Sequence, residues 1–361
     1  MVRFSDIIKK KDKKEPPRKL PENDAKEDGL RLSDSPISTI LSDSQLPKAS
    51  GYSISAGPPS TDNRSLEGIT YYEKFLEKAM DIRERVKNDQ GISPSPILSD
   101  LHYIINNNLI ENLYEYTARA PDDYDEVLVH TVEITFACLK VGKGMGYDTK
   151  MLLKLGLAAF LENVGMYKIP DSIIKKKGKL GEREIRIIRE HPGRSSEILG
   201  RMGERYKWLA EVVLQVHERA DGSGYPNGLK GKEIHELASI IGLMDTYTAM
   251  IKNRAYRDKF VPSDAMKFII KDSKNLFQPK ILKVFLNLIS LFPVNTYVRL
   301  NDKSIGRVIS TDKNQPLRPT IELLYDGLGN KLEEWKVIRL PEHPLLYITE
   351  SIDEKELPQK K

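Results

Sequence analysis

The sequence predicts a mainly helical protein with a disordered N-terminal tail and a small antiparallel β appendix at its C-terminal end. Apolar residues recur every three or four positions from about Ser65 to residue 292, which is the helical period. From residue 293 they alternate with polar residues, as in half-buried strands. Residues 1–65 contain too few large apolar side chains to form a core. We therefore expect a tail over 1–65, N-terminal helices over 66–121, a helical domain over 122–292, and a β extension with a C-terminal tail over 293–361.

The N-terminal tail carries the net charge of the chain, which is +5. The first 20 residues hold eight Lys or Arg and three acidic residues, and the remaining sequence is balanced. The basic isoelectric point therefore describes the tail and gives no indication of a nucleic-acid-binding face. Such a charge run is most often solvated, and a weak attraction to anionic lipid or to an acidic partner is the alternative.

The helices follow from the apolar period in chain order. Tyr71, Phe75 and Ile82 lie on one face of a first helix, and the polar break over 88–96 separates it from a second helix that carries the apolar residues between 98 and 113. We expect a third helix to open at Asp122-Asp123. Further helices are expected over 149–163, 182–190, 193–202, 206–218, 234–251, 263–273 and 279–291.

The C-terminal segment changes to alternation after Phe292-Pro293. Strands are expected over 296–300, 305–309, 320–324 and 335–340, with turn signals at Asn301-Asp302 and Asp326-Gly327. We therefore expect a small antiparallel sheet after the helical domain.

Cysteine usage and hydropathy suggest a cytoplasmic protein without a membrane span. Cys138 is the single cysteine, so an intramolecular disulfide is excluded and a reducing compartment fits. The longest apolar run, over 281–294, is interrupted by Lys283 and Asn287 and is too short to cross a bilayer. The N-terminus has no apolar segment typical of a signal peptide.

The stretch from Val216 to Gly231 is the most informative part of the chain. It places one histidine, two carboxylates and four glycines in sixteen residues, and it leads into a helix with Asp245 and a segment that ends at Arg257. This pattern resembles the HD-GYP family over some forty residues in register. The family consists of metal-dependent hydrolases that open the bacterial second messenger cyclic di-GMP. The resemblance implies an HD-superfamily helical bundle and a metal centre built from several helices.

Five positions match the metal ligands that the resemblance implies. In the family, two ions a few ångströms apart activate a hydroxide and hold a phosphate. The matching residues are Glu126, His130, His191, His217 and Asp245. Two of them also have a structural interpretation that involves no metal. Glu126 can be a negative charge that stabilises a helix N-terminus, and Asp245 can be a buried partner of His130.

The signature that names the family is altered. Glu162 and Asn163 stand where the family has His-Asp, and Val216 stands where it has the first of two paired histidines. Glu162 can still bind a metal through oxygen, whereas Asn163 lacks the charge of the aspartate that bridges two ions in the family. Met166 also replaces a lysine near the substrate phosphate. We therefore expect one weakly held iron or manganese ion, or none, with Asp245 as the main surviving catalytic group.

The glycine-rich loop supplies the expected nucleotide contacts. Gly222 and Gly224 allow close backbone approach. By resemblance, Tyr225 meets the substrate and Arg254 and Arg257 contact its phosphates, since a guanidinium suits paired phosphate oxygens. The structural alternative is a loop that joins two helices, with both arginines in salt bridges.

Two functions follow from the altered signature. The preferred one is a catalytically impaired protein of cyclic di-GMP signalling that senses the nucleotide or docks onto GGDEF-type cyclase domains or other signalling proteins. The alternative is an active metal-dependent phosphodiesterase with an altered centre. A scaffold without nucleotide, or an HD-superfamily hydrolase with another substrate, remains open.

Overall fold

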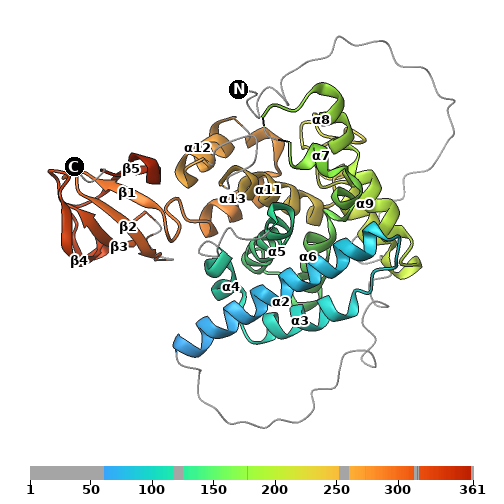
Figure 1. The fold of residues 1–361 in the computed structure, drawn as a ribbon, viewed down its shortest axis with the longest axis horizontal. Coiled ribbons are helices and arrows are strands. Elements are labelled where there is room, and N and C mark those ends of the chain that lie inside the picture. The colour runs from blue at the N-terminus through green and yellow to red at the C-terminus, as the bar shows by residue number, and fades with distance from the viewer. Residues whose placement is uncertain are drawn as a thin grey trace, which may run out of the picture. The chain divides into compact units, whose positions relative to one another are not determined.

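The computed structural model describes residues 61–117, 125–176, 178–251, 260–272, 274–312, 315 and 317–358 (Figure 1). Most of these residues are helical, which confirms the predicted fold class. The helices are α2 (Thr61–Lys87), α3 (Ser95–Asn106), α4 (Ile110–Thr117), α5 (Glu126–Gly144), α6 (Thr149–Leu161), α7 (Asp171–Ile174), α8 (Glu182–Arg189), α9 (His191–Gly200), α10 (Lys207–Leu214), α11 (Glu236–Ile251), α12 (Pro262–Asp272) and α13 (Pro279–Leu288).

Helix α5 lies at the centre of the helical body, where α2, α4, α6, α11 and α13 pack against it (Figure 1). Its residues are buried on nearly every side, including the polar His130, Thr131, Glu133 and Thr135. Cys138 is 0% exposed, and burial raises the pKa of its thiol. The helix begins at Glu126 because the Asp125 side chain accepts a hydrogen bond from the Val127 N–H. The predicted start at Asp122-Asp123 lies outside the described residues.

Two predicted helices differ in length from those observed. The expected second helix is divided into α3 and α4, because Asn108 adopts a positive φ of 56° between them. The helix expected over 206–218 ends at Leu214, since the next backbone N–H groups bond to carbonyls three residues back: Gln215 to Val212 and Val216 to Val213. His217 therefore lies in a turn after α10 rather than on a helix.

The C-terminal strands form one antiparallel sheet in the order β4-β3-β2-β1-β5. The strands are β1 (Tyr297–Leu300), β2 (Ile305–Ser310), β3 (Thr320–Tyr325), β4 (Lys331–Arg339) and β5 (Ile348–Ile352). The sheet has its own apolar core, which includes Val298, Val308 and Ile321. Strand β5 is not evident from the sequence, because two exposed polar residues occupy its middle and its support comes from pairing with β1.

Hydropathy excludes a membrane-crossing helix within the described part of the chain, where no helix is both long and apolar enough. Residues 1–60 and the segment that contains Arg254 and Arg257 lie outside the described residues. The expected tail and the division of the chain into domains therefore stay predictions.

Candidate metal centre

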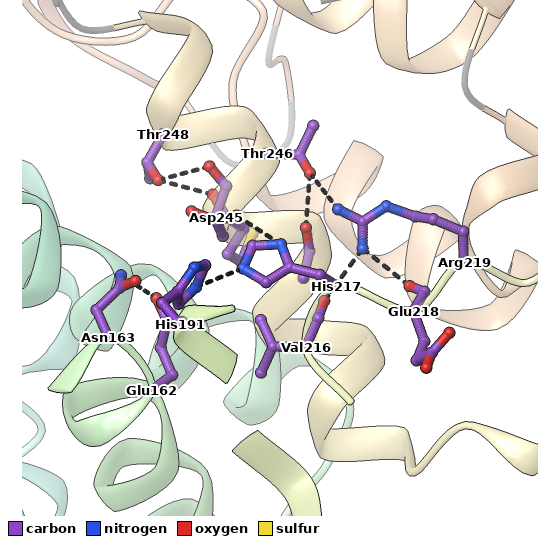
Figure 2. A network of polar contacts seen from close by, with 12 residues as sticks. Glu162, Asn163, His191, Val216, His217, Glu218, Arg219, Asp245, Thr246 and Thr248 are labelled. Atoms are coloured by element: carbon purple, nitrogen blue, oxygen red, sulfur yellow. Dashed lines mark hydrogen bonds and ion pairs between the residues drawn. The ribbon is translucent and has the colours of Figure 1, made fainter. Parts of the chain in front are cut away.

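Five residues that are distant in sequence, four of which are labelled in Figure 2, converge inside the helical body. Their positions follow from the ends of helices: Glu162 caps the C-terminus of α6, and His191 is the first residue of α9. His217 comes from the turn after α10, His130 from α5 and Asp245 from α11. Four of them are positions that match the family pattern, and the fifth, Glu162, stands at an altered position of the family signature.

Glu162, His191 and His217 form the group best suited to a metal ion. One ligand atom from each lies within 4.8 Å of the others. Glu162 is 1% exposed and His191 is 4% exposed, so little water competes with an ion for these atoms. Two imidazoles and one carboxylate are a donor set that suits a divalent first-row metal ion. The residues present therefore fit a single ion.

Hydrogen bonding and burial prepare the two imidazoles for this role. His191 Nδ1 lies 2.7 Å from the Ile188 carbonyl oxygen, so Nδ1 carries the hydrogen and Nε2 has the lone pair. His217 Nε2 is 2.9 Å from His191 Nε2. Burial lowers the pKa of both rings, and for His217 the nearby His191 lowers it further. Both rings are therefore neutral at pH 7, the form that binds a metal.

Asp245 connects this group to α5. One of its carboxylate oxygens lies 2.9 Å from His130 Nε2, and the other lies 3.8 Å from His217 Nδ1. The first contact is a hydrogen bond, and the second is too long to be one. This position is compatible with a role in the metal centre, because the carboxylate lies near His217. It is equally compatible with a structural role, because the same carboxylate bonds to the buried His130.

The positions that depart from the family pattern have distinct roles in the structure. The Asn163 Nδ2 group donates a hydrogen bond to Glu162 Oε1, so this amide contacts the carboxylate beside it (Figure 2). Val216 is 1% exposed and presents an apolar side chain next to His217. Glu126 is exposed in the first turn of α5 and is not part of the clustered ligand atoms. Met166 lies in the short 3-10 helix after Asn163.

Two glycines let the backbone carrying the histidines approach closely. A Cβ at Gly165 would meet the His191 carbonyl oxygen and the Ser195 N–H, and a Cβ at Gly242 would meet the Val216 carbonyl oxygen. Ser195 completes the first contact, because its hydroxyl accepts from the Gly165 N–H at 2.8 Å and donates to the Glu162 carbonyl at 2.7 Å. The spacing of the metal group therefore depends on two backbone contacts, one between the 3-10 helix after α6 and α9, and one between α11 and the turn after α10.

The glycine-rich loop is held by the residue that follows His217. Glu218 is 3% exposed, and its carboxylate accepts from the N–H groups of Asn227 at 2.7 Å and Leu229 at 3.0 Å. Arg219 donates to the carbonyls of Val216 and Glu218 at 3.1 and 2.9 Å. These bonds hold the glycine-rich loop against the turn that carries His217.

Tyr225 packs directly on the centre. Its ring stacks on the His217 ring with centroids 5.0 Å apart and planes 4° from parallel. Burial raises the pKa of its hydroxyl, which therefore stays protonated. The Arg189 guanidinium lies over the Tyr225 ring, 5.4 Å from its centroid, which is a cation–π distance.

Sequence reasoning missed the supporting residues Ser195, Glu218, Arg219 and Arg189. A Glu-Arg pair directly before a glycine-rich loop is a signal that could have indicated Glu218 and Arg219, because such loops need acceptors for their N–H groups. Ser195 and Arg189 carry no such local signal, since their contacts come from other helices. Gly222 has a positive φ of 82°, as the predicted turn requires.

Comparison with known proteins finds similar sequences and a similar fold. An HD domain model matches residues 105–281, and a model described as a KOW domain associated with HD domain matches residues 297–360. The cyclic di-GMP phosphodiesterase PdeB of Borreliella burgdorferi is 31% identical over 197 residues, which cover 55% of this chain and 52% of that protein. A cyclic di-GMP phosphodiesterase of Thermotoga maritima is 33% identical over 160 residues, 44% of each chain.

Residues 105–281 thus match the HD domain family, and the similar proteins are cyclic di-GMP phosphodiesterases. The chain spans about half the length of the relatives it matches. Its fold is also similar to that of Bd1817, an HDG"Y"P protein from Bdellovibrio bacteriovorus, with a TM-score of 0.50 at 13% identity, covering 63% of this chain and 73% of that one. Within this fold, Glu162, His191 and His217 are the described group that could hold a divalent ion.

Proposed function

We propose that this chain is a cyclic di-GMP-binding protein whose metal centre holds one divalent ion and whose hydrolytic activity is impaired. The observation that carries the proposal is the contact between Asn163 and Glu162. An amide that donates to the neighbouring carboxylate orients Glu162 but brings no second negative charge, which a bridged pair of ions requires. Val216 adds an apolar side chain instead of a further imidazole.

Iron or manganese is the ion that we propose for the centre, held by Glu162, His191 and His217. Such an ion would polarise a phosphate oxygen and lower the pKa of bound water. The protein's own groups would contribute orientation: Asp245 holds His217 and His130, and Asn163 holds Glu162. We propose Glu126 only as an outer carboxylate, since it is exposed.

The nucleotide side of the proposal rests on Tyr225 and its surroundings. Its protonated hydroxyl can donate to a phosphate or a base, and Arg189 supplies a cation beside it. Gly222 and Gly224 stay proposed substrate contacts, although the Gly224 backbone packs against that of Glu218 and Arg219. Arg254 and Arg257 stay candidates for phosphate contacts outside the described residues. Docking onto GGDEF-type domains and a cytoplasmic location remain parts of this proposal that need separate tests.

The second candidate is an active phosphodiesterase with a mononuclear centre. Its support is the donor set itself, because two neutral imidazoles and a carboxylate suit a catalytic ion. The relatives named above act on cyclic di-GMP, which makes this the natural substrate to test.

Hydrolysis of cyclic di-GMP under anoxic conditions with Fe(II) or Mn(II) separates the two candidates. We expect no product from the unaltered chain and a gain of product in the combined variant Glu162→His, Asn163→Asp and Val216→His, which restores the family pattern. The same variant with Asp245→Ala is the matched control and should be inactive. Product from the unaltered chain that disappears in Asp245→Ala would contradict the impairment and support the second candidate.

Nucleotide binding is measured separately by calorimetry on the same protein. We expect saturable binding of cyclic di-GMP that weakens about tenfold in Tyr225→Phe, the loss expected for one hydrogen bond to a charged group. Tyr206→Phe, in the short 3-10 helix before α10, is the control. Equal affinity in Tyr225→Phe and the unaltered chain would contradict the proposed contact.

A further inference from the structure

The proposed nucleotide site contains carboxylates that would repel an anionic ligand. Glu162 and Asp245 lie at its centre, and Met166 brings no charge where the family pattern has a lysine. Arg219 lies beside the centre, but it donates to backbone carbonyls. Cyclic di-GMP carries a negative charge on each of its two phosphodiesters. Cations from outside the metal group would therefore favour its approach.

Helix α8 brings a row of three arginines to this site. Arg183, Arg186 and Arg189 are spaced three residues apart, so successive members are neighbours on the helix surface. All three are exposed. Arg189 is the last of the row, and its guanidinium lies 5.4 Å from the centroid of the half-buried Tyr225 ring. From this end the row runs for about 9 Å along the helix, because an α-helix rises about 1.5 Å per residue.

The charges of Arg183 and Arg186 are available to a ligand. Neither side chain has a hydrogen bond or an ion pair with a residue that the structure describes. Two glutamates close to them in sequence have other cationic partners, in the pairs Glu184–Lys176 at 2.7 Å and Glu190–Arg194 at 2.8 Å. Two uncompensated guanidinium groups therefore face solvent on the helix that ends beside Tyr225.

We propose that Arg183 and Arg186 attract the phosphates of cyclic di-GMP toward Tyr225 and thereby set its rate of association. This inference rests on the nucleotide binding proposed above. Attraction between exposed charges extends over about 10 Å at about 0.1 M salt, so it acts on a ligand that is still approaching. A contact made only in the complex, such as that of Tyr225, acts on dissociation instead.

Stopped-flow fluorescence with labelled cyclic di-GMP tests the row on the full chain, without added metal, at about 0.02 M and about 0.5 M salt. We expect the double variant Arg183→Gln, Arg186→Gln to lower the association rate constant about fivefold at the lower salt concentration. At the higher concentration the difference should disappear, because the charges are screened. The dissociation rate constant should stay unchanged. Tyr225→Phe should show the opposite pattern, with faster dissociation and unchanged association.

The double variant Arg201→Gln, Arg339→Gln is the matched control. It removes the same amount of positive charge from exposed arginines elsewhere, one at the C-terminal end of α9 and one on β4. We expect it to associate with the nucleotide as fast as the unaltered chain does. Both double variants change exposed side chains only, so both should fold.

Three outcomes overturn this inference and leave nucleotide binding intact. Unchanged association in the α8 variant at the lower salt concentration removes the attraction. An equal loss in the control variant assigns the effect to net charge rather than to the row on α8. Faster dissociation with unchanged association makes the two arginines contacts of the bound nucleotide. Absence of nucleotide binding by the unaltered chain is a different result, because it overturns the proposed function and this inference together.

Discussion

Burial sets the protonation of the two imidazoles that face Glu162. The folded chain holds the pKa of His191 and of His217 below the ordinary value of about 6.5, chiefly through burial. In the unfolded chain both rings regain that ordinary value. Between the folded and unfolded pKa values, the unfolded chain therefore binds more protons than the folded chain.

The free energy of unfolding should consequently fall as the pH drops from 7.5 through 6.5 toward the depressed folded values. Urea unfolding of the metal-free protein between pH 5.5 and 8 measures this slope. We expect His217→Gln to reduce the slope, because one of the two linked protonations is removed. His102→Gln, on α3, is the control. A slope unaffected by His217→Gln would contradict the assigned protonation.

Asn163 is predicted to act on the metal through Glu162. Removing the amide in Asn163→Ala leaves the carboxylate without this hydrogen bond, so Mn(II) affinity should fall by about 10- to 100-fold. Calorimetric titration with Mn(II) measures the effect, and Asn107→Ala, at the end of α3, is the control. If Asn163→Ala binds Mn(II) as tightly as the unaltered chain, the amide does not position Glu162.

At the scale of elements, the loop after α10 depends on close backbone contact. A Cβ at Gly224 would overlap the backbone of Glu218 and Arg219, which cannot move aside as a flexible side chain could. We expect Gly224→Ala to lower the free energy of unfolding by about 1–3 kcal/mol, the usual range for overpacking. Urea unfolding and limited proteolysis of the loop measure the change.

Gly193 is the matched control for Gly224. It lies in α9, and nothing within 4 Å would meet a Cβ there. Alanine in a helix is about 0.5–1 kcal/mol more favourable than glycine, so Gly193→Ala should stabilise the protein. Destabilisation of equal size in both variants would show that loop contact is not the cause.

The sequence predicts elements well where burial has a regular period. The apolar spacing places α5, α6, α11 and α13 within a few residues of their observed ends, because their faces pack on the core. It does not separate α3 from α4, since that break depends on one residue with positive φ, Asn108. It also misses β5, because β5 is specified by pairing with β1 more than by its own side chains.

The candidate site could be predicted only in part, for a related reason. The family resemblance identified the histidines and Asp245, because their identity and spacing are local properties of the sequence. It could not predict that the Asn163 amide contacts Glu162, or that Glu126 stays exposed, since both depend on side-chain orientation in the folded chain. Ligand roles for all these residues remain predictions until metal binding is measured.

At the scale of the whole molecule, the helical body and the sheet have separate cores. The sheet has its own apolar cluster around Val298, Val308 and Ile321, whereas α5 organises the helical body. The candidate metal centre takes His130 from α5 and Asp245 from α11. An ion bound at the centre is therefore expected to stabilise the helical body in particular, by an amount that grows with its concentration above the dissociation constant.

The labelling rate of the single cysteine, which lies on α5, measures this stabilisation. Cys138 is fully buried, so a maleimide can react only during rare openings that expose α5. We expect slow labelling of the folded chain, slowed further by Mn(II) in proportion to the fraction of protein with ion bound, and unaffected by Mn(II) in His191→Ala. Fast labelling whose rate does not change with Mn(II) would contradict the predicted stabilisation of the helical body by the bound ion. The buried thiol thus reports, from inside one helix, how often the interior of this protein opens.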